Sequence, residues 1–226
     1  EGDTDTLRYN NLAAGEYKIK IERANYGAYT LENTFTPADL ENDIEPNDAD
    51  SIAVPILVNS SVTGHIGFYS NGYTDAIDYY SFATDVDGAI EFVLTPADSL
   101  LSSWVTLVGN SGDIISSYWL QNGEGDSDKL VWSNLSVGKY HVKVERNGYG
   151  SYTLSNSFLQ ATLPDDSEPN DSVSLAVSME INSTVTGRLG YSKEGKTDVE
   201  DYYTLTTNVD GELKFILSPA DSSLHS

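Results

Sequence analysis

The chain has 226 residues, of which 35 are acidic and 12 are basic, so its formal net charge is −23. A surface with this charge repels nucleic-acid backbones and anionic lipid, which argues against both as partners, and it attracts cations. Solubility is a simpler explanation of the acidity and stays open. Cysteine is absent, which excludes disulfides and thiolate metal sites. No apolar run approaches the roughly 18 residues that span a bilayer, so we expect no membrane insertion by this segment.

The first 37 residues are predicted to contain two strands. Tyr17, Ile19 and Ile21 alternate with polar residues, which is the period of a half-buried strand. A turn at 25–27 leads to a second strand, which begins with Tyr29 and Leu31. A polar connector over 36–42 then leads to an acidic motif.

The central part of the chain is predicted to be rich in short strands. Apolar residues alternate with polar ones in each run, and turn signals such as Asp87-Gly88 and Asn147-Gly148 separate the runs. The predicted strands cover 62–68, 80–82, 90–94, 104–108, 114–120, 129–132, 139–145 and 151–154. Short strands at this spacing, without a helical stretch, predict an all-β, antiparallel β-sandwich.

The sequence also repeats itself. Glu-Pro-Asn-Asp occurs at 45–48 and at 168–171, a separation of 123 residues, and Val-Thr-Gly at 62–64 returns at 185–187. This predicts tandem repeats of about 123 residues. The predicted domains are 1–37, the C-terminal part of a truncated repeat; 38–160, a complete β-sandwich repeat; and 161–226, the N-terminal part of a truncated repeat. The chain is then a window of a longer protein. We expect the two partial repeats to pair, within one chain or between chains, or else to be poorly ordered.

Four side chains with oxygen ligands lie within six residues, namely Asp43, Glu45, Asn47 and Asp48. Three negative charges this close raise the free energy of the folded chain unless a cation or a basic group neutralises them, and no Lys or Arg lies nearby in sequence. Calcium accepts six to eight oxygen ligands in flexible geometry. The cluster therefore favours a calcium site.

A second acidic pair, Asp75 and Asp78, precedes the strand at 80–82 and returns as Asp198 and Asp201. Both aspartates keep their register although the loop before them changes. The alternative is that these are turn and strand-start residues, and that Glu-Pro-Asn-Asp is a solvated linker.

The ordered motifs resemble a known family. Glu-Pro-Asn-Asp, Val-Thr-Gly, Asp-x-x-Asp-Tyr-Tyr, Gly-Lys-Tyr-x-Val-x-Val-Glu and Tyr-x-Leu are similar to the bacterial pre-peptidase C-terminal domain, a group that includes the collagen-binding domains of clostridial collagenases. The resemblance implies a jelly-roll-like β-sandwich, used as an accessory module in secreted peptidases and other exoproteins. It also implies these calcium ligands: Asp43, Glu45, Asn47, Asp48, Asp75 and Asp78, and in the next repeat Asp166, Glu168, Asn170, Asp171, Asp198 and Asp201. No motif here marks the family's collagen-contacting surface.

Catalysis is not expected. His65, His141 and His225 each align with a different residue type in another repeat, and we predict that they are surface residues. The sequence has no nucleophile elbow, no zinc-type histidine spacing and no phosphate-cradling glycine loop.

These observations predict a non-catalytic, calcium-binding accessory module of a bacterial protein that is secreted or on the cell surface, such as a peptidase. Its other partner is expected to be an extracellular protein or polysaccharide. One alternative is a structural spacer repeat of a cell-surface adhesin. Another is a carbohydrate-binding module that uses exposed aromatic residues such as Trp119 or Tyr73. In each case calcium is expected to tie the connector between repeats to the sandwich and to stiffen the array.

Overall fold

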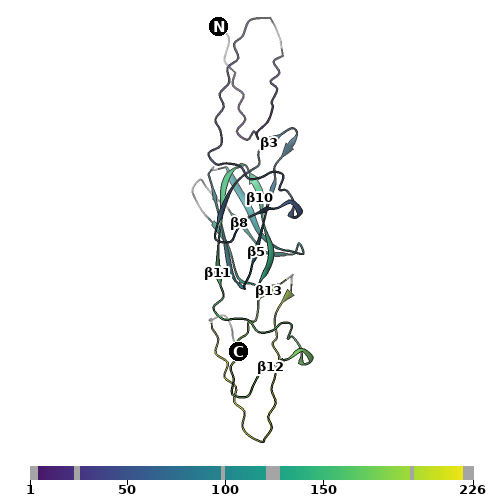
Figure 1. Cartoon of the computed structure of the whole chain (residues 1–226). Coiled ribbons are helices and arrows are strands. Elements are labelled where there is room, and N and C mark those ends of the chain that lie inside the picture. The colour runs from purple at the N-terminus through teal and green to yellow at the C-terminus, as the bar shows by residue number, and fades with distance from the viewer. Residues whose placement is uncertain (1–4, 23–25, 98–99, 121–127, 194–195, 221–226) are drawn as a thin grey trace.

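The computed structural model describes residues 5–22, 26–97, 100–120, 128–193 and 196–220. The molecule is elongated, with a β-sandwich in the middle (Figure 1). The segment leading from the N-terminus lies beyond one end of the sandwich, and the segment leading to the C-terminus lies beyond the other. Part of the predicted turn at 25–27 and His225 lie outside the described residues.

Two sheets form the sandwich. The first has the order β1-β5-β10-β7-β8 and the second has the order β14-β13-β9-β6-β11-β2. Most neighbouring strands are antiparallel, but β1 runs parallel to β5 and β13 runs parallel to β9. The strands of the first sheet are β1 (Val54–Pro55), β5 (Ile77–Thr84), β7 (Leu101–Gly109), β8 (Ile114–Leu120) and β10 (Gly138–Gly148). Those of the second sheet are β2 (Ser61–Ile66), β6 (Gly88–Pro96), β9 (Asp128–Leu135), β11 (Gly150–Gln160), β13 (Ser192–Lys193) and β14 (Lys196–Thr197).

The smaller elements occur in matched pairs, and the two members of each pair are 123 residues apart in the sequence. The pairs are the 3-10 turns η1 (Asp50–Ile52) and η2 (Val173–Leu175), the hairpins β3 (Tyr69–Ser70) with β4 (Tyr73–Thr74) and β13 with β14, and the parallel pairs β1 with β5 and β12 (Val177–Ser178) with β15 (Tyr203–Thr204). The two 3-10 turns are the helical elements of the described residues, and neither is long and apolar enough to span a lipid bilayer.

The alternating pattern of the sequence places apolar side chains between the sheets. In β6 every second residue is buried, and Ile90, Phe92 and Leu94 are each 1% exposed. They pack with Leu107 of β7 and Leu154 of β11 in one core. Burying a side chain of this size contributes about 1.5–3 kcal/mol, so the core is the main source of the sandwich's stability. All eight predicted central strands are present, and the all-β sandwich prediction is confirmed.

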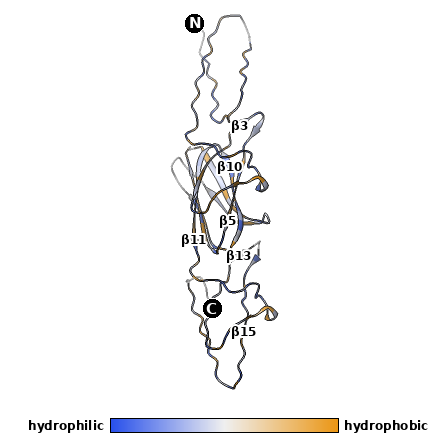
Figure 2. Cartoon of the chain, viewed as in Figure 1, coloured by the Kyte–Doolittle hydropathy of each residue, from blue (hydrophilic) through white to orange (hydrophobic). Residues whose placement is uncertain are grey.

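The strands predicted near the N-terminus are wrong. Tyr17, Ile19 and Ile21 are exposed, as are Tyr29 and Leu31, and these segments are extended without sheet pairing. Figure 2 shows hydrophobic residues interspersed with hydrophilic ones along this segment. In the described part of the chain no strand lies beside this segment to pair with it. An alternating segment without neighbours has neither ladder hydrogen bonds nor a core to cover.

The two terminal segments, 5–37 and 161–220, do not pair with each other in the described residues, because the sandwich lies between them (Figure 1). The expectation of pairing within one chain is therefore wrong for this structure. Pairing between chains stays a prediction. The apolar side chains left exposed at the C-terminal end include Phe215, Ile216 and Leu217.

Candidate metal centre

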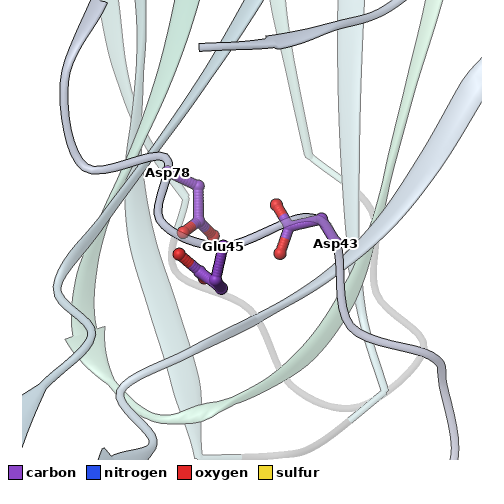
Figure 3. A group of neighbouring side chains, drawn as sticks. All are labelled: Asp43, Glu45 and Asp78. Atoms are coloured by element: carbon purple, nitrogen blue, oxygen red, sulfur yellow. The ribbon is translucent and has the colours of Figure 1, made fainter. Parts of the chain in front are cut away.

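The first acidic cluster lies where the connector enters the sandwich, beside the start of β5. The carboxylates of Asp43, Glu45 and Asp78 face one another, as Figure 3 shows, and one oxygen from each lies within 4.8 Å of the others. Calcium–oxygen distances are about 2.3–2.6 Å, so two ligands on opposite sides of one ion are about 5 Å apart. These three carboxylates are close enough to share one cation.

The connector is held in place by backbone and side-chain hydrogen bonds. Asn47, which is fully buried, donates from its side-chain nitrogen to Asp43 Oδ2 at 2.7 Å, and its backbone nitrogen donates to Glu45 Oε2 at 3.1 Å. The backbone nitrogen of Tyr79 donates to the carbonyl oxygen of Asn47 at 2.9 Å. The Glu45–Pro46 peptide bond is cis. This short segment therefore presents its oxygens inward toward Asp78.

Two buried tyrosines fix the aspartates from the sandwich side. The Tyr80 hydroxyl donates to Asp43, the Tyr152 hydroxyl donates to Asp78, and the two hydroxyl oxygens are 2.7 Å apart. Gly64 makes room for both rings, since a Cβ atom there would lie 2.6 Å from Tyr152 Oη and 2.7 Å from Tyr80 Oη. The repeated Val-Thr-Gly motif thus has a structural reason, which sequence reasoning noted only as a repeat.

The second site has the same arrangement. Asp166, Glu168 and Asp201 also offer oxygens within 4.8 Å of one another. Asn170 donates to Asp166 Oδ2 at 2.7 Å, and the Tyr203 hydroxyl donates to the same carboxylate. The Glu168–Pro169 peptide bond is cis as well. Asp201 is less buried than Asp78.

Each site leaves four buried oxygens without a hydrogen-bond partner among the described residues. They are Oδ1 of Asp43, Asn47, Asp75 and Asp78 at the first site, and Oδ1 of Asp166, Asn170, Asp198 and Asp201 at the second. Leaving a buried polar atom unpaired costs about 1–3 kcal/mol. The eight atoms are matched pairwise by the 123-residue offset and all are acceptors. A hard cation is the partner that fits such a set, because calcium takes carboxylate and amide oxygens alike.

The electrostatics of the metal-free cluster are unfavourable. Burial, reinforced by the charges of Asp43 and Asp48, raises the pKa of Glu45 to about 7. Burial and the charges of Glu45 and Asp48 raise the pKa of Asp75 to about 8. The pKa of Asp78 is raised well above its usual value, first by burial and then by the charge of Asp75. At the second site burial likewise raises the pKa of Asp198 to about 6 and that of Asp201 to about 7.

The remaining predicted ligands lie at the edge of the clusters. Asp48 Oδ1 accepts a hydrogen bond from the Tyr73 hydroxyl at 2.7 Å, which raises the pKa of Tyr73 to about 12. Asp171, the counterpart of Asp48, is exposed. Asp48 is half-buried, and neither Asp48 nor Asp171 belongs to the groups of three carboxylates that lie within 4.8 Å of one another.

His65, His141 and Trp119, which were predicted to lie at the surface, are partly exposed, whereas Tyr73 is exposed. His65 stacks on Phe68 with ring centroids 4.8 Å apart, and His141 packs edge-on against Tyr79. Both histidines are half-buried, so each keeps part of its surface exposed while its ring packs on an aromatic neighbour. Trp119 is half-buried against Trp104, with ring centroids 5.1 Å apart.

Comparison with known proteins gives structural likenesses but no sequence family. No family model matches the chain, and no curated protein matches its sequence. The pre-peptidase C-terminal domain of a collagenase from Bacillus anthracis matches with 21% identity and a TM-score of 0.37, over 51% of this chain and 100% of that one. PliG from Aeromonas hydrophila, a periplasmic inhibitor of g-type lysozyme, matches with 14% identity and a TM-score of 0.31, over 47% of this chain and 97% of that one. PliG from Salmonella Typhimurium matches with 17% identity and a TM-score of 0.29. Likenesses of this size identify neither a family nor a function.

Proposed function

We propose that the chain is a non-catalytic module whose two acidic clusters each bind one calcium ion. The observation that carries this proposal is the set of buried, unpaired oxygens, four at each site and the same atoms in both. In each site two of these oxygens belong to aspartates of a group of three carboxylates that one cation can reach. The cation joins the connector, through Asp43, to the sandwich, through Asp78.

We further propose that the chain consists of tandem repeats, with 38–160 as the complete one, in a secreted or cell-surface bacterial protein. The recurrence of the hydrogen bonds and 3-10 turns at the 123-residue offset supports this division. Calcium at millimolar concentration is available outside cells, where weak oxygen sites of this kind are used. The module then positions a neighbouring domain, such as a peptidase, on an extracellular protein or polysaccharide.

A structural spacer is the second candidate. The chain enters the sandwich at one end and leaves it at the other (Figure 1), so consecutive repeats extend the molecule instead of folding back. This arrangement favours a role in setting distance. Retention of the chain on collagen or on insoluble polysaccharide would favour the first role, and a lack of retention on either would favour the spacer.

Calcium binding is tested by titration calorimetry on the full chain at pH 8. We expect two calcium ions per chain for the wild-type protein and one for each of the variants Asp78→Asn and Asp201→Asn. Asp85→Asn, an exposed aspartate on the turn after β5, is the matched control and should keep both sites. A wild-type chain that binds no calcium, or a stoichiometry that Asp78→Asn leaves unchanged, would overturn the proposal.

A further inference from the structure

The sandwich is joined to its two flanking segments by contacts that involve the same residue positions. We define the tail turn as residues 134–136, at the end of β9, and its counterpart as 11–13. We define the head corner as residues 67–69, after β2, and its counterpart as 190–192. At each end of the sandwich a tail turn meets the head corner of the segment that follows it along the chain.

At the N-terminal end, the counterpart of the tail turn contacts the head corner of the sandwich. The Asn11 side-chain nitrogen donates to the carbonyl oxygen of Gly67 at 2.9 Å. Leu12 forms a parallel β-bridge with Tyr69. Two backbone hydrogen bonds close this bridge: Tyr69 N donates to Asn11 O at 2.7 Å and Ala13 N donates to Tyr69 O at 2.9 Å.

At the C-terminal end, the tail turn of the sandwich makes the matching contacts. The Asn134 side-chain nitrogen donates to the carbonyl oxygen of Gly190. Leu135, which is fully buried, pairs in parallel with Ser192. Each of these four positions is displaced by 123 from its partner in the first contact. Through this pairing β13 and β14 join the six-stranded sheet, which continues past the end of the sandwich.

A basic side chain next to each head corner donates a hydrogen bond to the backbone of the segment that leads into the acidic motif, at Leu40 before the first motif and at Leu163 before the second. His65 Nε2 lies 2.6 Å from the carbonyl oxygen of Leu40 and donates to it, and Arg188 donates to the matching carbonyl oxygen of Leu163. Arg188 also forms an ion pair with Asp87 of the preceding sandwich. The side chains of this pair are 11% and 8% exposed, so water screens it little, and removing one partner leaves a buried charge unpaired.

From these matched contacts we propose that the tail turn and the head corner form a specific docking surface between successive repeats. The partner of each surface is the next copy of the same repeat. An asparagine amide that donates to a glycine carbonyl, together with a two-residue parallel bridge, fixes both the separation and the rotation of the two repeats. The connector is therefore not a flexible tether, and every joint of this type sets the same geometry. The proposal does not depend on the metal sites, because none of the joint residues belongs to them.

Spin-label distances test the joint directly. The chain has no cysteine, so Asn110→Cys and Ser174→Cys, both at exposed positions, can be labelled without background. One label reports on the sandwich and the other on the segment that follows it. With saturating calcium throughout, we expect one narrow distance peak for the otherwise wild-type chain. The double variant Asn134→Ala, Arg188→Ala is expected to lose this peak and to give a broad distribution.

Two further variants make the result specific. Asn134→Ala alone keeps the ion pair and should broaden the peak less than the double variant does. Asn11→Ala removes the same contact at the other joint, so it should leave this peak as narrow as in the wild type. Circular dichroism should show the same β content for all variants. A broad distance distribution in the wild type, or a distribution in the double variant as narrow as that of the wild type, would overturn the proposal. Calorimetry on the double variant should still count two calcium ions.

Discussion

The strongest consequence of the metal proposal is a large stabilisation of the sandwich by calcium. The perturbation is saturating calcium against a chelator at pH 8. In the metal-free chain the first site leaves four buried oxygens unpaired, which at about 1–3 kcal/mol each is a gross penalty of about 4–12 kcal/mol. A cation can offset that penalty only as far as its affinity allows. At a calcium concentration of one hundred times the Kd, the stabilisation is about 2.7 kcal/mol.

The expected readout is a shift in the melting temperature. Apart from β13 and β14, the strands of the two sheets run from residue 54 to residue 160. For a domain slightly above roughly 100 residues, 1 kcal/mol corresponds to about 4 °C. Calcium should therefore raise the melting temperature by about 10 °C in differential scanning calorimetry. Magnesium at the same concentration should give a smaller shift, because it needs shorter bonds in octahedral geometry. A melting temperature that is equal in chelator and in calcium would refute the reasoning.

Four further predictions follow from the site and from the ends of the molecule. In chelator, the free energy of unfolding should fall as the pH rises from about 4 to about 8. The reason is that the raised pKa values of Glu45 and Asp75 make the folded chain bind protons more tightly than the unfolded one. Chemical denaturation across this range checks the sign, and a stability that rises with pH would contradict it. Tyr152→Phe removes the hydroxyl that holds the buried aspartate of the first site and should cost about 2 kcal/mol in the calcium-loaded protein, measured by urea unfolding; an unchanged midpoint would count against that role. Gly64→Ala places a methyl group against two tyrosine hydroxyls and should cost about 1–3 kcal/mol, whereas Gly211→Ala, with open space around it, should cost far less; equal losses would argue against the packing role. The exposed apolar faces of the terminal segments should make the chain associate as its concentration rises in analytical ultracentrifugation, and a monomer at every concentration would dismiss pairing between chains.

The sequence allowed the strands of the sandwich to be predicted because burial has a simple period there. Ile90, Phe92 and Leu94 lie on one face of β6 and are buried for that reason. The same alternation at Tyr17 and Ile19 gave a wrong prediction. Periodicity reports which side chains share a face, but a strand also needs a neighbour to pair with.

The acidic residues of the site could be found from their oxygen ligands and their repetition, but their supports could not. Nothing in the sequence indicates that Tyr152 reaches Asp78 across 74 positions, because that contact depends on the order of strands in the sandwich. The joint was missed for a related reason. The available signal for the joint was that Asn11 and Asn134 are identical residues 123 positions apart. A single asparagine in a turn, however, suggests only local structure.

The position of the first site also determines how the sandwich resists tension. The connector enters at one end, and the chain then runs along β5 through η1 and β1. Only after that does it turn into β2, which pairs with β11. When the two ends of the chain are pulled apart, the force first peels this entering segment from the sheet, one contact at a time. A cation held between Asp43 and Asp78 transfers the load at the point of entry to β5, and through the Tyr152 hydroxyl to β11. Under the proposed calcium binding, the calcium concentration sets the force at which the sandwich begins to open.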